Sequence, residues 1–210
     1  MKNHGYEHKS LEEAKKHTSV RERYCLNKFF DALNKKAGYR KYDFNEAPLW
    51  EKQFDGTVKI YDKKNNFIAY YIIEAKVREE LHKDYIYEKS YKEKILKAKE
   101  EKDVLLKEYN LEAGILYINF MWNGVLIWDI LDLIEQGKLN RGKRDMFNKK
   151  TIASREDKVL KSVYHLQTED AKFYTDFMFS NKTFLAWYEE LKTPKQPQKE
   201  EKKTTTYSIF

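Results

Sequence analysis

The apolar positions in the first part of the chain follow a helical spacing. Four of them recur three or four residues apart and so share one face of a helix. We therefore expect a helix from Thr18 or Ser19, either of which is able to cap it, to about Lys36, before Gly38 ends the pattern. The apolar residues of this face are Leu26, Phe29, Phe30 and Leu33.

Two later regions have the pattern of β-hairpins. Residues 54–61 and 67–77 are rich in aromatic and β-branched side chains, and a polar cluster separates them. Residues 114–121 are apolar as well, and the Asn-Gly pair that follows them is a strong turn signal before a return strand at 125–130. The sequence therefore predicts two hairpins about 60 residues apart.

Helical patterns alternate with these hairpins. Residues 84–109 are rich in Lys and Glu with apolar residues interspersed, which predicts a long solvated helix, and residues 168–191 have a helical pattern too. The expected fold class is α/β (α+β), a central mixed β-sheet flanked by helices. Its expected order is α-β-β-α-β-β with C-terminal helices.

Composition divides the chain into three parts. Residues 1–17 are polar and mostly charged, which predicts a flexible N-terminal segment or a loose helix, and residues 18–192 form the predicted domain. From 193 to 210 the chain is rich in Pro, Lys, Gln, Glu and Thr, which predicts a disordered tail. The tail ends on Tyr207-Ser208-Ile209-Phe210, and we interpret these apolar residues either as a docking peptide for a protein partner or as an inert end.

Charge and cysteine content narrow the class of protein. Lys and Arg number 41 against 34 Asp and Glu, so the formal net charge is +7 and a polyanion is a natural partner. The single Cys25 cannot form an internal disulfide and no long uncharged apolar run occurs. We therefore expect a reducing cytoplasm, with no signal peptide and no membrane span. The five histidines are too scattered for a zinc site, and no Gly-rich phosphate loop is present.

The residues that suggest chemistry lie on the first predicted hairpin. Asp55 begins its first strand, and Glu74 and Lys76 share one face at the end of its second. If the turn is centred between Lys64 and Asn65, Asp55 pairs with Glu74. If the turn lies one residue later, Asp55 pairs with Lys76 and Glu74 is diagonal; both registers bring the three side chains together. Two carboxylates this close repel unless a cation or a shared proton separates them, and their oxygens suit Mg²⁺ or Mn²⁺.

Metal-assisted phosphodiester hydrolysis uses this set of groups, with the ammonium of Lys76 placed to position water or to offset negative charge in the transition state. The Glu-x-Lys triplet alone is weak evidence, because it also occurs elsewhere in the chain. Only the copy at Glu74 ends a strand-like segment and follows an Asp at hairpin-symmetric distance. The alternative interpretation is an ion-pair cluster on a sheet edge.

This arrangement resembles the PD-(D/E)XK nuclease superfamily, which includes restriction-type endonucleases and Holliday-junction resolvases. The resemblance covers about Ser19 to Ile130 and rests on the helix, Phe54-Asp55, the hairpin, Glu74-Ala75-Lys76, and the helix and strand that follow. It implies a restriction-endonuclease-like core and Mg²⁺- or Mn²⁺-dependent cleavage of DNA. It also implies a metal held by Asp55, Glu74 and Ala75, with Lys76 as the catalytic lysine. Phe54 stands where the motif has Pro.

A third carboxylate is predicted near the metal. Glu22 precedes Leu26 by four residues and Phe29 by seven, so it lies on the apolar stripe of the first helix. The resemblance implies that such a Glu is a metal neighbour and part of the catalytic set. The alternative is a Glu favoured by the helix macrodipole, and Glu46 is a weaker candidate for the same role.

Two segments are candidates for contacts with nucleic acid. The first, Lys89, Tyr91 and Lys92, resembles the segment with which several phage and bacterial members begin their next helix. The second is the most basic segment of the chain, and its cations would add a salt-dependent, sequence-independent contribution to binding. Its candidate residues are Arg141, Lys143, Arg144, Lys149 and Lys150. Ordinary solvated surface is the alternative for both.

The predicted function is therefore a Mg²⁺-dependent deoxyribonuclease of a bacterial cell or a phage-infected host. The alternative is a catalytically silent nuclease-fold protein that binds DNA or serves in assembly. Cleavage of RNA and formation of a homodimer remain open. The sequence indicates neither the DNA specificity nor whether one or two metal ions take part.

Overall fold

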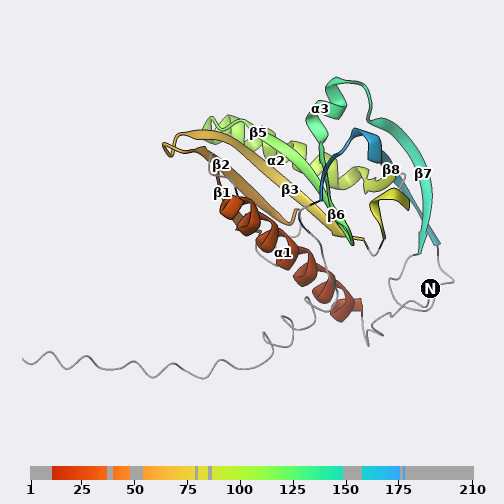
Figure 1. Cartoon of the computed structure of the whole chain (residues 1–210). Helices are drawn as coiled ribbons and strands as arrows, with labels where there is room; N and C mark the ends of the chain where they lie inside the picture. The colour runs from red at the N-terminus through yellow and green to blue at the C-terminus, as the bar shows by residue number, and fades with distance from the viewer. Residues whose placement is uncertain are drawn as a thin grey trace, which may run out of the picture. The chain divides into compact units, whose positions relative to one another are not determined.

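A mixed β-sheet lies at the centre of the fold (Figure 1). The computed structural model describes residues 11–36, 40–47, 54–78, 80–84, 87–148, 158–175 and 177. The strands of this sheet are β1 (Arg40–Glu46), β2 (Gly56–Asp62), β3 (Phe67–Val77), β5 (Ala113–Met121), β6 (Gly124–Asp129) and β9 (Lys172–Tyr174). They pair in the order β1-β2-β3-β5-β6-β9, and every pair is antiparallel except β3 with β5. The predicted α/β class and mixed sheet are thus confirmed.

Three helices in the described part of the chain pack on this sheet. They are α1 (Leu11–Lys36), α2 (Lys92–Tyr109) and α3 (Ile130–Glu135). The rings of Phe120 in β5 and Phe29 in α1 are in contact, with centroids 6.0 Å apart, whereas Tyr117 of β5 lies in the core cluster that includes Ile95 of α2. Residues three apart in a strand face opposite ways. The helices α1 and α2 therefore cover opposite faces of the sheet, as Figure 1 shows.

The apolar face predicted for the first helix is the face that packs on the sheet. Leu26 is fully buried, and Phe29 and Phe30 are nearly so. The helix contacts β1 and β3 along this face. Glu22 lies on the same stripe and is 4% exposed, so α1 carries one carboxylate into the interior.

A smaller sheet continues the domain. Its strands are β4 (Tyr87–Tyr91), β7 (Asn140–Asn148) and β8 (Lys158–Gln167), in the order β4-β8-β7, and the 3₁₀ helix His82–Asp84 precedes β4. Glu88 of β4 is only 1% exposed and accepts hydrogen bonds from Arg78 Nε at 2.8 Å and Asn119 Nδ2 at 2.6 Å. A buried carboxylate needs such partners, so these hydrogen bonds connect the small sheet to Arg78 after β3 and to Asn119 in β5.

The hairpin of β2 and β3 adopts the first of the two predicted registers. Gly56 pairs with Ile73 and Val58 with Tyr71, and the register shifts by one residue between Ile60 and Tyr61, which pairs with Phe67. Asp55 lies one residue before this ladder, and its N–H donates to the carbonyl of Ile73 at 2.8 Å. Asp62 organises the turn, because its Oδ1 accepts the backbone N–H groups of Lys64 and Asn66 at 2.7 and 2.8 Å. The predicted register thus holds from Gly56 to Ile60, whereas Asp55 lies outside the paired residues, and its pairing with Glu74 stays a prediction.

Several elements differ from the prediction. The first helix begins at Leu11 rather than near residue 18, and β1 has no counterpart among the predicted elements. The prediction of one helix over 84–109 is wrong, since residues 87–91 form β4 and α2 begins only at Lys92. The residues of β4 that point inward are Glu88 and Ser90, so this strand has no apolar alternation by which to recognise it.

The predicted helix from residue 168 is also wrong over its described part. Residues 168–170 form a 3₁₀ helix, and β9 follows and pairs with β6. The strands β7 and β8 and the short helix α3 had not been predicted either. Residues 1–10, the remainder of 168–191 from residue 178 on, and the tail 193–210 with its Tyr207–Phe210 peptide lie outside the described residues. No described helix has both the length and the apolarity needed to cross a membrane.

Candidate active site

The four predicted catalytic residues meet at the end of β3. The ammonium nitrogen of Lys76 lies 3.1 Å from Glu22 Oε1, 3.0 Å from Glu74 Oε1 and 4.0 Å from Asp55 Oδ2. These contacts place the Asp55 and Glu74 oxygens no more than 7.0 Å apart. The structure therefore brings together residues separated by up to 54 positions in the chain.

Backbone pairing holds Asp55 in place. Its N–H donates to the carbonyl of Ile73 at 2.8 Å, and its Oδ2 accepts the N–H of Ala75 at 2.7 Å. The carboxylate of Asp55 therefore stands beside the main chain between Glu74 and Lys76. A shift of one residue in the register would turn β3 over and remove both side chains from this position.

Burial and mutual repulsion dominate the electrostatics of the acids. Burial raises the pKa of Glu22 to about 8; the Lys76 ammonium opposes this rise, and the carboxylates of Asp55 and Glu74 add to it. Burial raises the pKa of Asp55 as well, although Lys76 opposes that shift. For Lys76 burial acts in the other direction, but the three carboxylates outweigh it and raise the pKa of the ammonium well above its usual range. Lys76 is therefore a firmly protonated cation.

A second lysine, which no motif in the sequence marks, also reaches Glu74. Lys94 Nζ lies 3.0 Å from Glu74 Oε2, whereas Lys76 contacts Oε1 of the same carboxylate. Lys94 stands in the first turn of α2, and the helix of a βαβ crossover begins near the carboxyl end of the preceding strand. A lysine in the first turn of this helix could therefore have been predicted to lie near Glu74. The prediction misses it because the expected helix starts at residue 84, which does not put Lys94 in the first turn.

The donor atoms of this cluster suit a hard divalent cation in kind. Glu22, Asp55 and Glu74 offer carboxylate oxygens, and the carbonyl of Ala75 accepts from Lys76 Nζ at 2.5 Å. All four predicted metal ligands thus have an oxygen within 4.0 Å of one point.

The spacing of these oxygens is that of ammonium contacts. Among the described residues, no three Asp, Glu, His or Cys side chains are close enough to hold one metal ion. Mg²⁺ binds oxygen at about 2.1 Å, so an ion at the Lys76 Nζ position would require the Glu22 and Glu74 oxygens to move inward by roughly 1 Å and the Asp55 oxygen by roughly 2 Å. The cluster therefore has the oxygen atoms that such an ion binds, but their distances are longer than metal–oxygen bonds.

Glu46, the weaker candidate for the third carboxylate, is directed elsewhere. Its Oε2 lies 3.6 Å from Arg23 Nη1, its Oε1 accepts from Asn27, and its side chain is 42% exposed. Glu22 is the α1 carboxylate that contacts Lys76.

The predicted nucleic-acid-binding residues that the structure describes lie in β4, α2 and β7. Lys89 and Tyr91 lie in β4 rather than in a helix, and Lys92 is the exposed first residue of α2. Arg141, Lys143 and Arg144 lie in β7, and Lys149 and Lys150 fall outside the described residues. The smaller sheet thus places a basic strand, β7, two positions from β4, which leads into α2 and the cluster.

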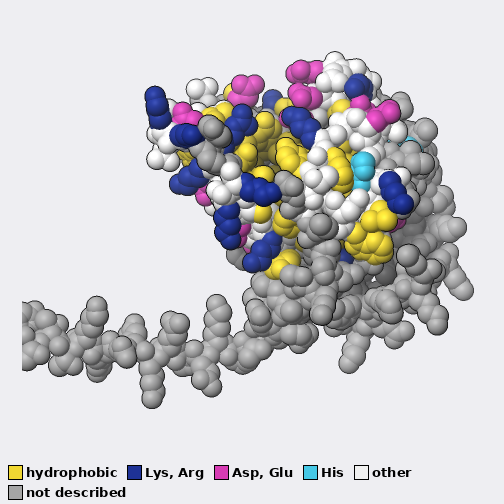
Figure 2. Space-filling view, viewed as in Figure 1, with side chains coloured by type: hydrophobic (Ala, Val, Ile, Leu, Met, Phe, Trp, Pro, Cys, Tyr) yellow, Lys and Arg dark blue, Asp and Glu magenta, His cyan; other side chains and the backbone are white. Residues whose placement is uncertain are grey.

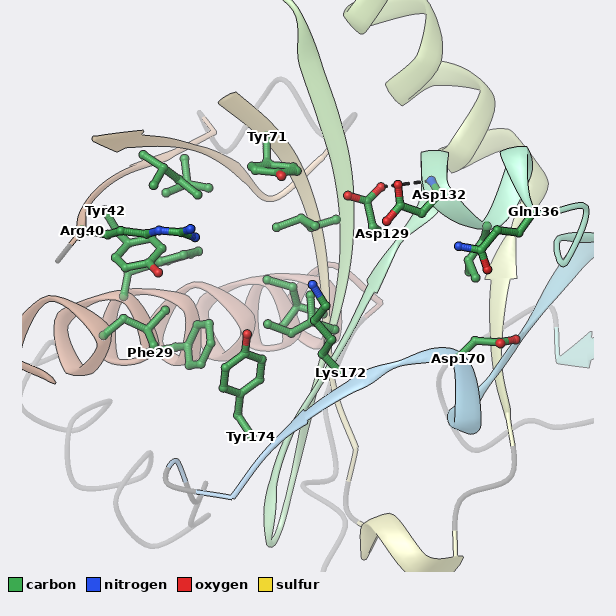
Figure 3. Close-up of a pocket in the computed structure, with 18 of the residues that line it drawn as sticks. Phe29, Arg40, Tyr42, Tyr71, Asp129, Asp132, Gln136, Asp170, Lys172 and Tyr174 are labelled. Carbon is green, nitrogen blue, oxygen red and sulfur yellow. Dashed lines mark hydrogen bonds between the residues drawn. The ribbon is translucent and has the colours of Figure 1, made fainter. Parts of the chain in front are cut away.

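A hollow among the described residues lies on the α1 face of the sheet. It is a cavity of about 330 Å³, and Figure 2 shows hydrophobic side chains exposed in this face with charged side chains around them. Ile118 is among its lining residues. Phe29, Arg40, Asp129 and Lys172 line it as well (Figure 3).

Two of the three aspartates that line this cavity, Asp129 and Asp170, have structural roles. Asp129 caps α3 by accepting the N–H groups of Leu131 and Asp132, at 3.1 and 3.3 Å. Asp170 pairs with Lys138 at 2.7 Å. The cavity therefore has volume without the converging carboxylates and cation of the cluster at β3.

Comparison of the chain with models of known families, with curated proteins and with solved structures gives no match.

Proposed function

We propose that this chain is a divalent-metal-dependent endonuclease of the PD-(D/E)XK type that hydrolyses phosphodiester bonds of DNA. The strongest support is the convergence of four oxygens from Glu22, Asp55, Glu74 and Ala75 on the ammonium nitrogen of Lys76. Three carboxylates in such proximity repel one another and lose hydration on burial. An arrangement this unfavourable is typical of a functional site rather than of a structural ion pair.

Each residue of the cluster would have its own role in the reaction. Asp55, Glu74, Glu22 and the Ala75 carbonyl would hold the cation, and Mg²⁺ or Mn²⁺ there would offset charge on the phosphate and lower the pKa of a bound water. Lys76 stays protonated because its pKa is raised well above its usual range. We therefore assign it the role of a hydrogen-bond donor to the attacking water or to a phosphate oxygen.

The charge of the chain supports a polyanionic substrate. The formal net charge is +7, Lys92 is exposed at the start of α2, and β7 carries Arg141, Lys143 and Arg144 in the sheet that contains β4. Cations in such positions contact phosphates without reading the base sequence. DNA is the substrate that the resemblance implies. Parallel assays with RNA test whether the chain prefers DNA.

A second candidate function is a nuclease-fold protein that binds DNA without cleaving it. The observation that favours it is the Lys76 ammonium, which already neutralises the oxygens expected to bind metal. In that case the cluster would be a stable ion network, and binding would show a steep salt dependence without turnover.

Plasmid cleavage distinguishes the two functions. The purified chain is incubated with supercoiled DNA, and in parallel with RNA, in Mg²⁺, Mn²⁺ or a chelator. We expect DNA cleavage only with metal, and a loss of at least about 100-fold in Asp55→Asn. The matched control is Asp62→Asn at the turn of the same hairpin, which keeps its hydrogen-bond acceptor and should cleave within about twofold of the unsubstituted chain. Salt-sensitive DNA binding without metal-dependent cleavage would favour the second function.

A further inference from the structure

We propose that the ammonium of Lys76 is a built-in competitor for the divalent cation, and that metal binding displaces it from the oxygens of the cluster. This inference rests on the proposed function and adds a step that precedes catalysis. It also distinguishes two lysines that contact the same carboxylate.

The positions of the oxygens support direct competition. Lys76 Nζ contacts Glu22 Oε1 at 3.1 Å, Glu74 Oε1 at 3.0 Å and the Ala75 carbonyl at 2.5 Å, with Asp55 Oδ2 at 4.0 Å. These are the oxygens that we assign to the metal. One set of oxygens cannot bind a divalent ion at about 2.1 Å and keep an ammonium between them. Metal binding therefore requires Lys76 Nζ to leave this position.

The chain offers a way for Lys76 to move while Glu74 stays in place. The Lys76 side chain is 23% exposed and carries its charge on a flexible four-carbon stem, so rotation of this stem can carry the ammonium out of the cluster. Lys94 contacts the other oxygen of Glu74, Oε2, at 3.0 Å. Glu74 thus retains a cationic partner when its Oε1 binds the metal. In this proposal the ammonium of Lys76 leaves the cluster when the metal binds, whereas Lys94 keeps its contact with Glu74.

Titration of metal binding in two variants tests this division. Ca²⁺ and Mg²⁺ binding to the full chain is measured by calorimetry for the unsubstituted protein, Lys76→Met and Lys94→Met. We expect Lys76→Met to bind at least about tenfold more tightly, because both the occupant and its repulsion are removed. Lys94→Met removes an equal charge that also touches Glu74 but lies outside the oxygens, so we expect a gain of no more than about threefold. Melting temperatures of all three proteins show that they are folded.

A second measurement uses the unsubstituted chain and so does not depend on the folding of a variant. Its lysines are modified with an amine-reactive reagent with and without Ca²⁺, and the peptide that contains Lys76 is quantified by mass spectrometry. An amine held by four oxygens is protected, whereas a displaced amine is exposed. We expect the modification of Lys76 to increase several-fold with Ca²⁺ and that of Lys97, exposed on α2, to stay constant.

The outcomes separate this inference from the proposed function. If the unsubstituted chain cleaves DNA with Mg²⁺ but Lys76→Met binds metal no more tightly, or Lys94→Met gains as much as Lys76→Met, the displacement is wrong and the nuclease stands. Unchanged modification of Lys76 in saturating Ca²⁺ would overturn the displacement as well. If neither the chain nor any variant binds a divalent ion, both proposals fail.

Discussion

The strand β3 contributes to two regions of different character. Near its start Tyr71 lines the cavity of about 330 Å³ on the α1 face, and at its end Glu74 and Lys76 form the charged cluster with Asp55 and Glu22. The cavity has a large volume, but two of its aspartates cap a helix or pair with a lysine at the surface. In the cluster three carboxylates and an ammonium lie within contact distance. We place the proposed function at the cluster rather than at the cavity because bringing like charges together costs free energy.

The first prediction concerns the floor of the cavity. Ile118 is fully buried and lines the cavity, so Ile118→Ala should lower the free energy of unfolding by about 2–4 kcal/mol through lost burial and added void. Urea denaturation measures this loss. The folded variant should cleave plasmid at the rate of the unsubstituted chain. A loss of cleavage without a loss of stability would show that the cavity belongs to the active site.

The second prediction compares Glu22, which contacts Lys76 in the cluster, with Glu46, which pairs with Arg23. Glu22→Gln removes a carboxylate that contacts Lys76 at 3.1 Å, and should lower cleavage by about 10- to 100-fold. Glu46→Gln makes the same chemical change at a residue that pairs with Arg23, and should stay within about threefold. Initial rates at saturating Mg²⁺ measure both. Equal rates in the two variants would remove Glu22 from the catalytic set.

The cluster could be predicted from the sequence because most of it depends on local geometry. The strands β2 and β3 are joined by a short turn, and the two-residue period of a strand puts Glu74 and Lys76 on one face. The helical period of α1 places Glu22 on the apolar stripe. The two-residue period of the strands and the 3.6-residue period of the helix therefore leave few possible arrangements for these side chains.

The remaining elements depend on pairings between distant residues. The strand β4 pairs residues 87–91 with residues 163–167, and the three-residue strand β9 pairs with β6 from about 45 residues away. Glu88 is buried by Arg78 and Asn119, partners that no local pattern indicates. A polar residue that is buried only because distant groups satisfy it cannot be distinguished from a surface residue by its own segment.

The third prediction concerns the pH dependence of stability without metal. The pKa of Glu22 rises from an ordinary 4.5 to about 8 on folding, mainly through burial. The folded chain thus keeps a proton that the unfolded chain releases, so this residue's contribution to stability is greatest below about pH 4.5 and is lost as the pH rises to about 8. Between pH 5 and 8, in chelator, the unsubstituted chain should lose about 1–3 kcal/mol more than Glu22→Gln. Urea denaturation at pH 5, 6.5 and 8 measures the difference, and parallel pH profiles would contradict it.

The smallest expected effect concerns the ion pair at the edge of the cavity. Lys138 lies 2.7 Å from Asp170, but its side chain is 49% exposed, so water and salt screen the pair. Lys138→Gln should therefore change the free energy of unfolding by no more than about 0.5 kcal/mol and leave cleavage unaltered. Urea denaturation and the plasmid assay measure the two quantities. Lys76 forms ion pairs of similar length with carboxylates that are buried or nearly so, and its loss should alter metal affinity. A cost above about 1.5 kcal/mol for Lys138→Gln would mean that burial of the charges does not separate the two regions.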